Sequence, residues 1–256
     1  MLSHFHVGER EEPIEPLHGF ARHPFANVRC RGHRGGEDAF NIQYLILHNN
    51  CGSPAPKPRV LLFDMGASVG FKGVPNGIYP TMPEHGGGLA PSLPLFYRLY
   101  TDRCLEPDEV YAWEPNPGAE ALGAQWWGNL SASVRAKVHY YQDFVNEGDL
   151  STAESIGGAH PENSFLEILE STAKPDDFVV AKVDIDTPSA ELTIVEAIAE
   201  RPEIAELVDE FFFEYHFYFD NQNFGWGHKN INGDVDTAVG LMYRLRSLGI
   251  RAHFWI

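Results

Sequence analysis

Acidic residues recur at one kind of position in this chain, directly after short apolar runs that are typical of buried strands. In a parallel sheet the carboxyl ends of the strands meet at the same edge, and ligands bind at that edge. Carboxylates placed there can accept hydrogen bonds from a sugar, bind a cation or take up a proton. The acidic residues in such positions are Asp64, Glu114, Asp143, Asp184, Asp186 and Glu214.

A turn of small residues follows the first of these runs. After Asp64 comes Met65-Gly66-Ala67-Ser68-Val69-Gly70, and glycine lets the backbone approach a ligand closely. Glu114 ends the second run, and its two carboxylate oxygens match the spacing of a ribose diol. Asp143 ends the third run, where it would be within reach of an adenine amino group. A glycine turn followed by acids on successive strands favours a ligand that contains a nucleoside.

His216 ends the fifth apolar run, and the ordinary pKa of histidine suits a proton acceptor near neutral pH. The alternative is a histidine at the end of a buried strand, hydrogen-bonded to Glu214. Asp184 and Asp186 are the other candidates for the proton acceptor. These four residues are also candidates for a metal site, because carboxylate oxygens with one imidazole suit Mg²⁺, Mn²⁺ or Fe²⁺ better than Zn²⁺.

The elements that would position these residues alternate between strands and helices from Val60 to the end of the sequence. Such alternation predicts an α/β fold of the Rossmann-like, doubly wound type, with a mostly parallel sheet and helices on both faces. The predicted strands cover residues 40–48, 60–64, 109–113, 137–144, 177–183, 207–216 and 251–256. The predicted helices cover residues 92–105, 119–127, 164–172, 188–201 and 236–248.

The chain is predicted to form a single globular domain. Residues 59–256 form its Rossmann-like part, and residues 1–58 an N-terminal arm and strand that pack on this core. Within that arm, residues 1–37 show little periodicity and predict irregular structure with at most one short helix. Residues 71–91 are rich in Gly and Pro and predict a long irregular stretch, which in a compact domain is usually functional or mobile.

Composition excludes several classes of function. Apolar residues make up 43% of the chain and charged residues 21%, which is typical of a folded domain rather than a disordered one. The net charge of −17 disfavours nucleic acid as a partner. No apolar run reaches the roughly 18 residues that span a bilayer, and no secretory signal is visible, so we expect a cytoplasmic protein. The three cysteines have no close pair, which argues against a disulfide framework and against a zinc knuckle.

Three motifs resemble those of the FkbM-type family of class I methyltransferases. Residues 64–70 are similar to the family's Asp-x-Gly-Ala-Asn-x-Gly, with Ser68 in place of its Asn. Residues 181–186, followed by Glu191, resemble its second motif, and residues 213–216 resemble the Glu-x-His that ends its fifth strand. The resemblance implies a Rossmann-like fold, S-adenosylmethionine as cofactor, and methylation of a hydroxyl on a sugar or other small molecule.

Carried onto this sequence, the resemblance also implies roles for single residues. Glu114 would hold the ribose of the cofactor, Asp143 would contact its adenine, and Asp184 would face the transferred methyl group. The methionine and ribose side would be lined by Asp64, Gly66, Ser68 and Gly70. The sequence departs from the family in the stretch between Gly66 and Glu114, which is longer because it includes residues 71–91.

Two other functions fit the same fold. An acidic cluster that binds a metal would suit an enzyme of different chemistry, such as hydrolysis or glycosyl transfer. The long stretch at residues 71–91 would also suit a binding protein that has the fold without the cofactor.

Overall fold

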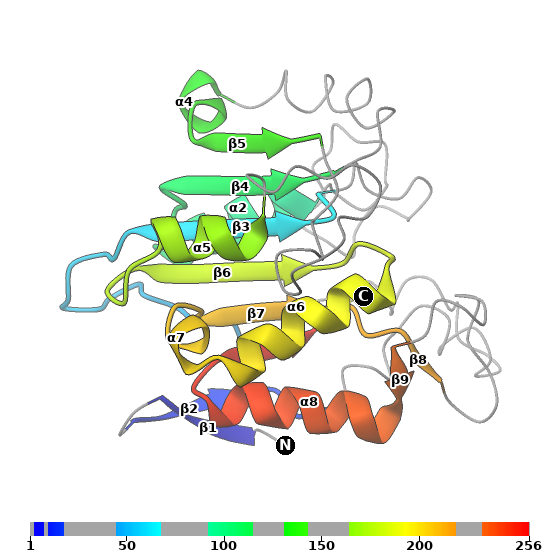
Figure 1. Cartoon of the computed structure of the whole chain (residues 1–256). Coiled ribbons are helices and arrows are strands. Elements are labelled where there is room, and N and C mark those ends of the chain that lie inside the picture. Colours follow the sequence, from blue (N-terminus) through cyan, green and yellow to red (C-terminus); the bar gives the residue numbers. More distant parts are fainter. Residues whose placement is uncertain are drawn as a thin grey trace, which may run out of the picture.

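A six-stranded sheet, parallel throughout, forms the centre of the protein (Figure 1). The computed structural model describes residues 3–7, 10–17, 45–67, 92–114, 131–142, 164–218 and 232–255. Along the sheet the strands are β10 (Arg251–Phe254), β7 (Glu210–Phe213), β6 (Phe178–Val183), β3 (Val60–Met65), β4 (Glu109–Trp113) and β5 (Val138–Tyr141). The predicted doubly wound α/β fold is therefore confirmed.

The order of the strands places a topological switch point between β3 and β6. From β3 the chain runs outward through β4 to β5, then returns to β6 on the other side of β3 and continues outward through β7 to β10. β3 and β6 pair in parallel register from Val60 beside Phe178 to Met65 beside Val183. Dinucleotide-binding Rossmann folds share this order, and ligands of such sheets bind outside the carboxyl ends of the strands at the switch point.

Helices cover both faces of the sheet, as predicted (Figure 1). α2 (Ser92–Thr101) packs on one face. The other face carries α5 (Phe165–Thr172), α6 (Pro188–Glu200) and α8 (Val235–Ser247). Two helices of a single turn, α4 (Ala132–Arg135) and α7 (Pro202–Ala205), lead into β5 and β7.

β3 illustrates why a central strand is almost entirely apolar, with Asp64 as its one polar residue. Leu61, Phe63 and Met65 belong to the core on the side of α5, α6 and α8, whereas Val60 and Leu62 belong to the core on the side of α2. Because successive side chains of a strand point to opposite faces, a central strand covered on both sides is apolar wherever a polar side chain has no buried partner. Asp64 has such partners in Lys182 and Ser92. All six residues of β3 are buried.

The N-terminal region differs from the prediction. β1 (Ser3–Val7) and β2 (Arg10–Ile14) form an antiparallel hairpin, so the expectation of irregular structure was wrong there. Buried charges tie the end of this hairpin to β10. Glu15 accepts a hydrogen bond from Arg246 at 3.0 Å and lies 2.7 Å from His253, whose other ring nitrogen lies 2.9 Å from Glu210.

Several predicted boundaries also differ. The strand predicted at residues 207–216 ends at Phe213. Of the strand predicted at residues 40–48, the structure describes only the part from Leu45 onward, and that part forms no strand. Pro188 begins α6 as predicted, and Thr187 directly before it makes no side-chain capping hydrogen bond. The predicted helix at 119–127 and the stretch at 71–91 lie outside the described residues. After β7 the chain forms β8 (Phe217–Tyr218), which pairs with β9 (Gly233–Asp234).

A disulfide joins Cys51 and Cys104, so the prediction from the cysteine count was wrong. The two cysteines are 53 positions apart in the sequence, but the fold brings their turns together, as the hydrogen bond from Asn50 N to Arg103 O shows. The turn before β3 is thereby linked to the end of α2. Among the described residues, no helix is long and apolar enough to cross a membrane, as the sequence predicted.

Candidate functional site

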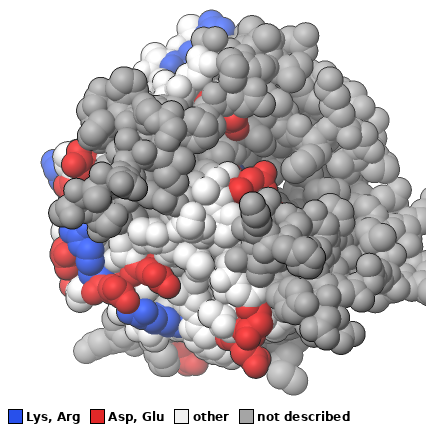
Figure 2. Space-filling model, turned by 45° about the vertical axis from the view of Figure 1, so that its right-hand side comes forward, with Lys and Arg blue, Asp and Glu red and all other residues white. Residues whose placement is uncertain are grey.

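Four neighbouring strands carry an acidic residue at their carboxyl ends. In the order of the sheet these strands are β4, β3, β6 and β7, and the acids are Glu114, Asp64, Asp184 and Glu214. Figure 2 turns this edge of the sheet forward; acidic atoms lie near the middle of the described surface, and Lys and Arg atoms lie toward its margins. The structure thus brings together strand-end acids that are far apart in the sequence.

Gly66 forms the turn at the end of β3. Its φ is 82°, and a Cβ at this position would lie 1.6 Å from the carbonyl oxygen of Asp184. The backbone nitrogens of Gly66 and Ala67 both donate to the carbonyl oxygen of Trp113, at 3.0 and 2.9 Å. Glycine is therefore required at position 66 because the ends of β3, β4 and β6 meet here. This requirement holds whether or not a ligand binds at the turn.

Lys182 lies in β6 beneath the turn, with 1% of its side chain exposed. Its Nζ lies 3.2 Å from Asp64 Oδ1 and 3.1 Å from Asp184 Oδ2, and it donates to the carbonyl oxygen of Gly66 at 3.0 Å. The two carboxylates keep the pKa of Lys182 above its ordinary value, although burial alone would lower it. The ammonium of Lys182 therefore links the ends of β3 and β6 through its two carboxylate partners.

Asp64 is completely buried, and its second carboxylate oxygen accepts a hydrogen bond from the Ser92 hydroxyl at 2.6 Å. It thereby fixes the start of α2 and the ammonium of Lys182 at the switch point. Within the described structure, the carboxylate of Asp64 contacts Lys182 and Ser92. A direct contact between Asp64 and a cofactor therefore stays a prediction.

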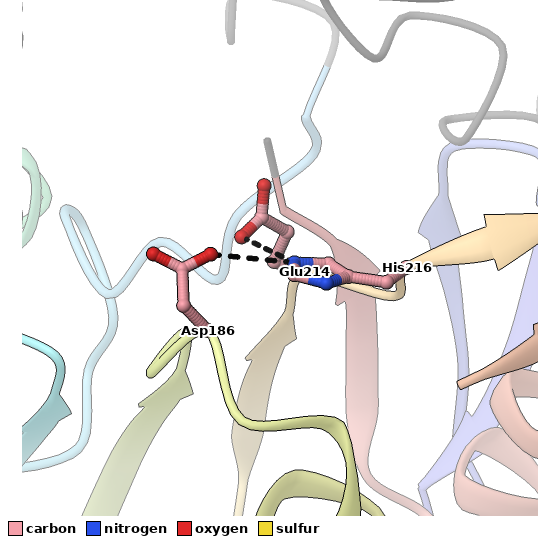
Figure 3. A group of neighbouring side chains, drawn as sticks. All are labelled: Asp186, Glu214 and His216. Carbon is pink, nitrogen blue, oxygen red and sulfur yellow. Dashed lines mark hydrogen bonds and ion pairs between the residues drawn. The ribbon is translucent and has the colours of Figure 1, made fainter. Parts of the chain in front are cut away.

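A second cluster lies at the ends of β6 and β7. Asp186, Glu214 and His216 each point one ligand atom toward the others (Figure 3), and these three atoms lie within 4.8 Å of one another. His216 Nε2 is 3.2 Å from Glu214 Oε2 and 3.7 Å from Asp186 Oδ1. Asp186 has a φ of 54°, a backbone conformation that Asp adopts more readily than most residues.

Two side chains, those of the half-buried Asn232 and the buried Glu191, fix the backbone around this cluster. Asn232, just before β9, accepts a hydrogen bond from the His216 backbone and donates its own backbone N–H to the carbonyl oxygen of His216 at 2.7 Å. Its side-chain nitrogen donates to Glu191 at 3.3 Å, and Glu191 also accepts from the Ile185 backbone at 3.0 Å. The loops after β6 and β7 are therefore held in register with the start of α6.

The electrostatic setting shifts several pKa values. Burial raises the pKa of Asp184 well above its ordinary range, opposed by the charge of Lys182 and reinforced by Glu214. Burial likewise raises the pKa of Glu191. For His216, burial alone would lower the pKa, but the hydrogen bond to Glu214 and the charges of the surrounding acids raise it overall.

The remaining predicted residues are placed only in part. Glu114 lies half-buried directly after β4, and its backbone nitrogen donates to the carbonyl oxygen of Tyr141 in β5 at 3.1 Å. The preceding residue, Trp113, accepts the bonds from the Gly66 turn. Ser68, Gly70 and Asp143 lie outside the described residues, and their predicted contacts stay predictions.

Sequence reasoning assigned no role to several residues that build this site. A lysine within the apolar run of β6 is a signal that could have identified Lys182, because a buried ammonium requires carboxylate partners. Glu191 carries a similar signal, as an acid in the first turn of a buried helix. Ser92 is only the first residue of the helix predicted at residues 92–105, and no signal in the sequence marks Asn232.

The strand order and the edge at which the acids gather define a Rossmann-like, doubly wound α/β protein. No family model, no curated protein and no solved structure matches the chain. The resemblance to FkbM-type methyltransferases thus rests on the motifs alone.

Proposed function

We propose that the protein is an S-adenosylmethionine-dependent methyltransferase that acts on a hydroxyl group. The observation that carries this proposal is the charge at the switch point. Acidic residues lie at the carboxyl ends of β4, β3, β6 and β7. Among the described residues, Lys182 is the one Lys or Arg at this edge, and it forms ion pairs with Asp64 and Asp184. Such an edge repels the pyrophosphate of a dinucleotide and attracts a cofactor that carries a sulfonium and an ammonium group.

The residues also fit the nucleoside part of this cofactor. Glu114 lies beside the Gly66 turn, because the backbone nitrogens of Gly66 and Ala67 bond to the residue just before it, Trp113. A half-buried carboxylate at the end of the second strand can accept both hydroxyls of a ribose. Glu114 would therefore orient the ribose, and the Gly66 turn would adjoin the methionine part.

Bound S-adenosylmethionine would supply an activated methyl group, so the protein has to orient the acceptor and remove its proton. Asp184 is engaged by Lys182 at 3.1 Å and is less suited to take that proton. Asp186 is exposed, and its Oδ1 lies 3.7 Å from His216 Nε2. We assign proton removal to the group of Asp186 and His216, with Glu214 holding the imidazole.

The acceptor we propose is a small molecule or a sugar, because an acidic edge disfavours a nucleic acid. The cytoplasmic location stays a prediction, and the Cys51–Cys104 disulfide argues against it, since such bonds persist mainly in oxidising compartments.

Calorimetric titration of the whole chain with S-adenosylhomocysteine tests the proposal. We expect saturable binding, and we expect Glu114→Gln to weaken it by about tenfold or more, as loss of a hydrogen bond to a charged group does. Glu206→Gln is the matched control, because it removes the same charge from an exposed position next to the opposite ends of the strands.

Tighter binding of NAD⁺ than of S-adenosylhomocysteine would overturn the proposal, and so would no binding of S-adenosylhomocysteine at millimolar concentration. An unchanged affinity in Glu114→Gln would overturn the assignment of the ribose.

A further inference from the structure

We propose that Asp186, Glu214 and His216 bind a divalent metal ion of the Mg²⁺ or Mn²⁺ type at the carboxyl ends of β6 and β7. The proposal concerns cation binding and does not depend on methyl transfer. With the ion bound, Asp186 and His216 would be its ligands, so the proton removal assigned to them above applies to the metal-free protein.

The separations between the ligand atoms fit such an ion. With bonds of about 2.1 Å, two ligand atoms at right angles lie about 3.0 Å apart and two opposite ones about 4.2 Å apart. His216 Nε2 lies 3.2 Å from the Glu214 oxygen and 3.7 Å from the Asp186 oxygen, and all three atoms fall within 4.8 Å. A small movement of the exposed Asp186 would therefore complete a three-ligand site.

The cluster differs from a group of surface acids because its imidazole lies inside the protein. The side chain of His216 is 0% exposed and that of Glu214 is 12% exposed, whereas that of Asp186 is 83% exposed. Figure 3 shows the imidazole edge turned toward both carboxylates. The inner ligands are therefore fixed in advance by the ends of the sheet, and Asp186 leaves an open side through which an ion can enter.

The charge around the cluster also favours a cation. Lys182 lies within 3.2 Å of both Asp64 and Asp184, so its single charge is already shared between two carboxylates. The carboxylates of Asp186 and Glu214 instead meet at the imidazole of His216, and together they could balance the charge of one divalent ion. Carboxylates that are partly removed from water are stabilised by a counter-ion held at close range.

The donor set indicates which ions fit. Two carboxylate oxygens and one imidazole nitrogen suit Mn²⁺, Fe²⁺ or Mg²⁺, ions that prefer six ligands. Three ligands from the protein would leave three positions for water or for oxygen atoms of a small ligand. A compound with two neighbouring oxygens is therefore the class of ligand that the loaded site would take.

The test is a titration of the whole chain with Mn²⁺ after a chelator has removed any bound metal. Electron paramagnetic resonance measures the free and the bound Mn²⁺ at each step. We expect a single saturable Mn²⁺ site. Asp186→Asn changes an exposed side chain, so the fold is expected to persist, and it should weaken the affinity for Mn²⁺ by about tenfold or more. Asp176→Asn is the matched control, since it removes an equal exposed charge before the opposite end of β6.

Two further variants test the inner ligands. Glu214→Gln should weaken Mn²⁺ binding as Asp186→Asn does. In spin-echo spectra of bound Mn²⁺, we expect nitrogen coupling from one imidazole, which should disappear in His216→Gln. Urea unfolding of each variant verifies that a loss of binding is not a loss of the fold.

Absence of saturable binding at millimolar Mn²⁺ would overturn the proposal, as would affinities in Asp186→Asn and Glu214→Gln equal to that of the unmodified chain. Because the readout is metal binding without S-adenosylhomocysteine, failure here leaves the calorimetric test of the methyltransferase proposal unaffected, and the reverse also holds.

Discussion

Gly66 and Asp184 approach each other so closely that a Cβ on Gly66 would lie 1.6 Å from the carbonyl oxygen of Asp184. That oxygen belongs to the backbone at the end of β6, so it cannot turn away as the tip of a side chain could. The φ of 82° at Gly66 is a second constraint, because other residues rarely adopt it. Glycine at position 66 is therefore what lets the two central strand ends meet at the switch point.

Gly66→Ala should lower the free energy of unfolding by more than the about 1–2 kcal/mol expected for a positive φ alone. The excess arises from the clash with the backbone of Asp184, and urea unfolding measures it. Gly52→Ala is the matched control, since Gly52 has a φ of 81° but open space around its Cβ position. Equal losses in the two variants would show that the contact with Asp184 has no energetic consequence.

Lys182→Met should destabilise the protein by about 3–5 kcal/mol, because it leaves the buried carboxylate of Asp64 without its cation. Adding Asp64→Asn to this variant should restore part of the loss in urea unfolding. Lys57→Met serves as a control: Lys57 forms an exposed ion pair with Asp108 at 2.6 Å, and removing such a pair costs about 0–1 kcal/mol. A loss of that size in Lys182→Met would refute the role assigned to Lys182.

The central strands could be predicted because burial on both faces leaves a clear pattern. β4 was predicted with its observed limits, and β3 and β6 to within one residue. The hairpin of β1 and β2 could not be predicted, because the segment REEPI at residues 10–14 is mostly charged and shows no apolar alternation. Its pairing depends on contacts with distant parts of the chain, including the bond between Arg246 and Glu15.

The candidate site was predictable to a similar extent. Acids at strand ends follow from the parallel sheet, so the meeting of Asp184, Asp186 and Glu214 at one edge could be inferred. Asn232 could not, because it reaches the end of β7 from the segment before α8, and the sequence does not show that approach. The disulfide escaped prediction for the same reason, since Cys51 and Cys104 lie in turns that meet only in the fold.

His253 links the N-terminal region to the sheet and makes stability depend on pH. Its side chain is fully buried, with Glu15 at 2.7 Å and Glu210 at 2.9 Å from its two ring nitrogens. Burial alone would lower the pKa of His253, but these carboxylates raise it above 6.5. Contacts with His253 and Arg246 lower the pKa of Glu15 below 4.5, against the effect of burial. The charged or titratable groups around the imidazole are Glu12, Glu15, His48, Glu210, Arg246 and Arg251.

These two shifts give opposite pH dependences. The stabilisation from the raised pKa of His253 is complete below about pH 6.5 and is lost as pH rises through its pKa in the folded protein. The stabilisation from the lowered pKa of Glu15 is complete above about pH 4.5 and is lost as pH falls through its folded value. We therefore expect this network to stabilise the fold most between these values.

Urea unfolding at pH 5.5 and pH 8.5 measures the alkaline side of this dependence. His253→Gln should reduce the difference in unfolding free energy between the two pH values, because it removes the group that loses its proton. His139→Gln is the control, since His139 lies on the edge strand β5 with a surface ion pair to Glu109, and it should change the difference less than His253→Gln does. A pH dependence in His253→Gln equal to that of the unmodified chain would contradict the assignment.

Reduction of the Cys51–Cys104 disulfide should lower the free energy of unfolding by about 2–4 kcal/mol, because the bond restricts the unfolded chain over a separation of 53 positions. Urea unfolding with and without a reductant measures the loss. Cys51→Ser should be destabilised to a similar degree and should no longer respond to the reductant, whereas Cys30→Ser should keep the full response. The bond lies next to the amino ends of β3 and β4, away from the candidate site, so binding of S-adenosylhomocysteine should persist after reduction wherever the protein stays folded. A response to reductant that survives in Cys51→Ser would show that another thiol pair is responsible.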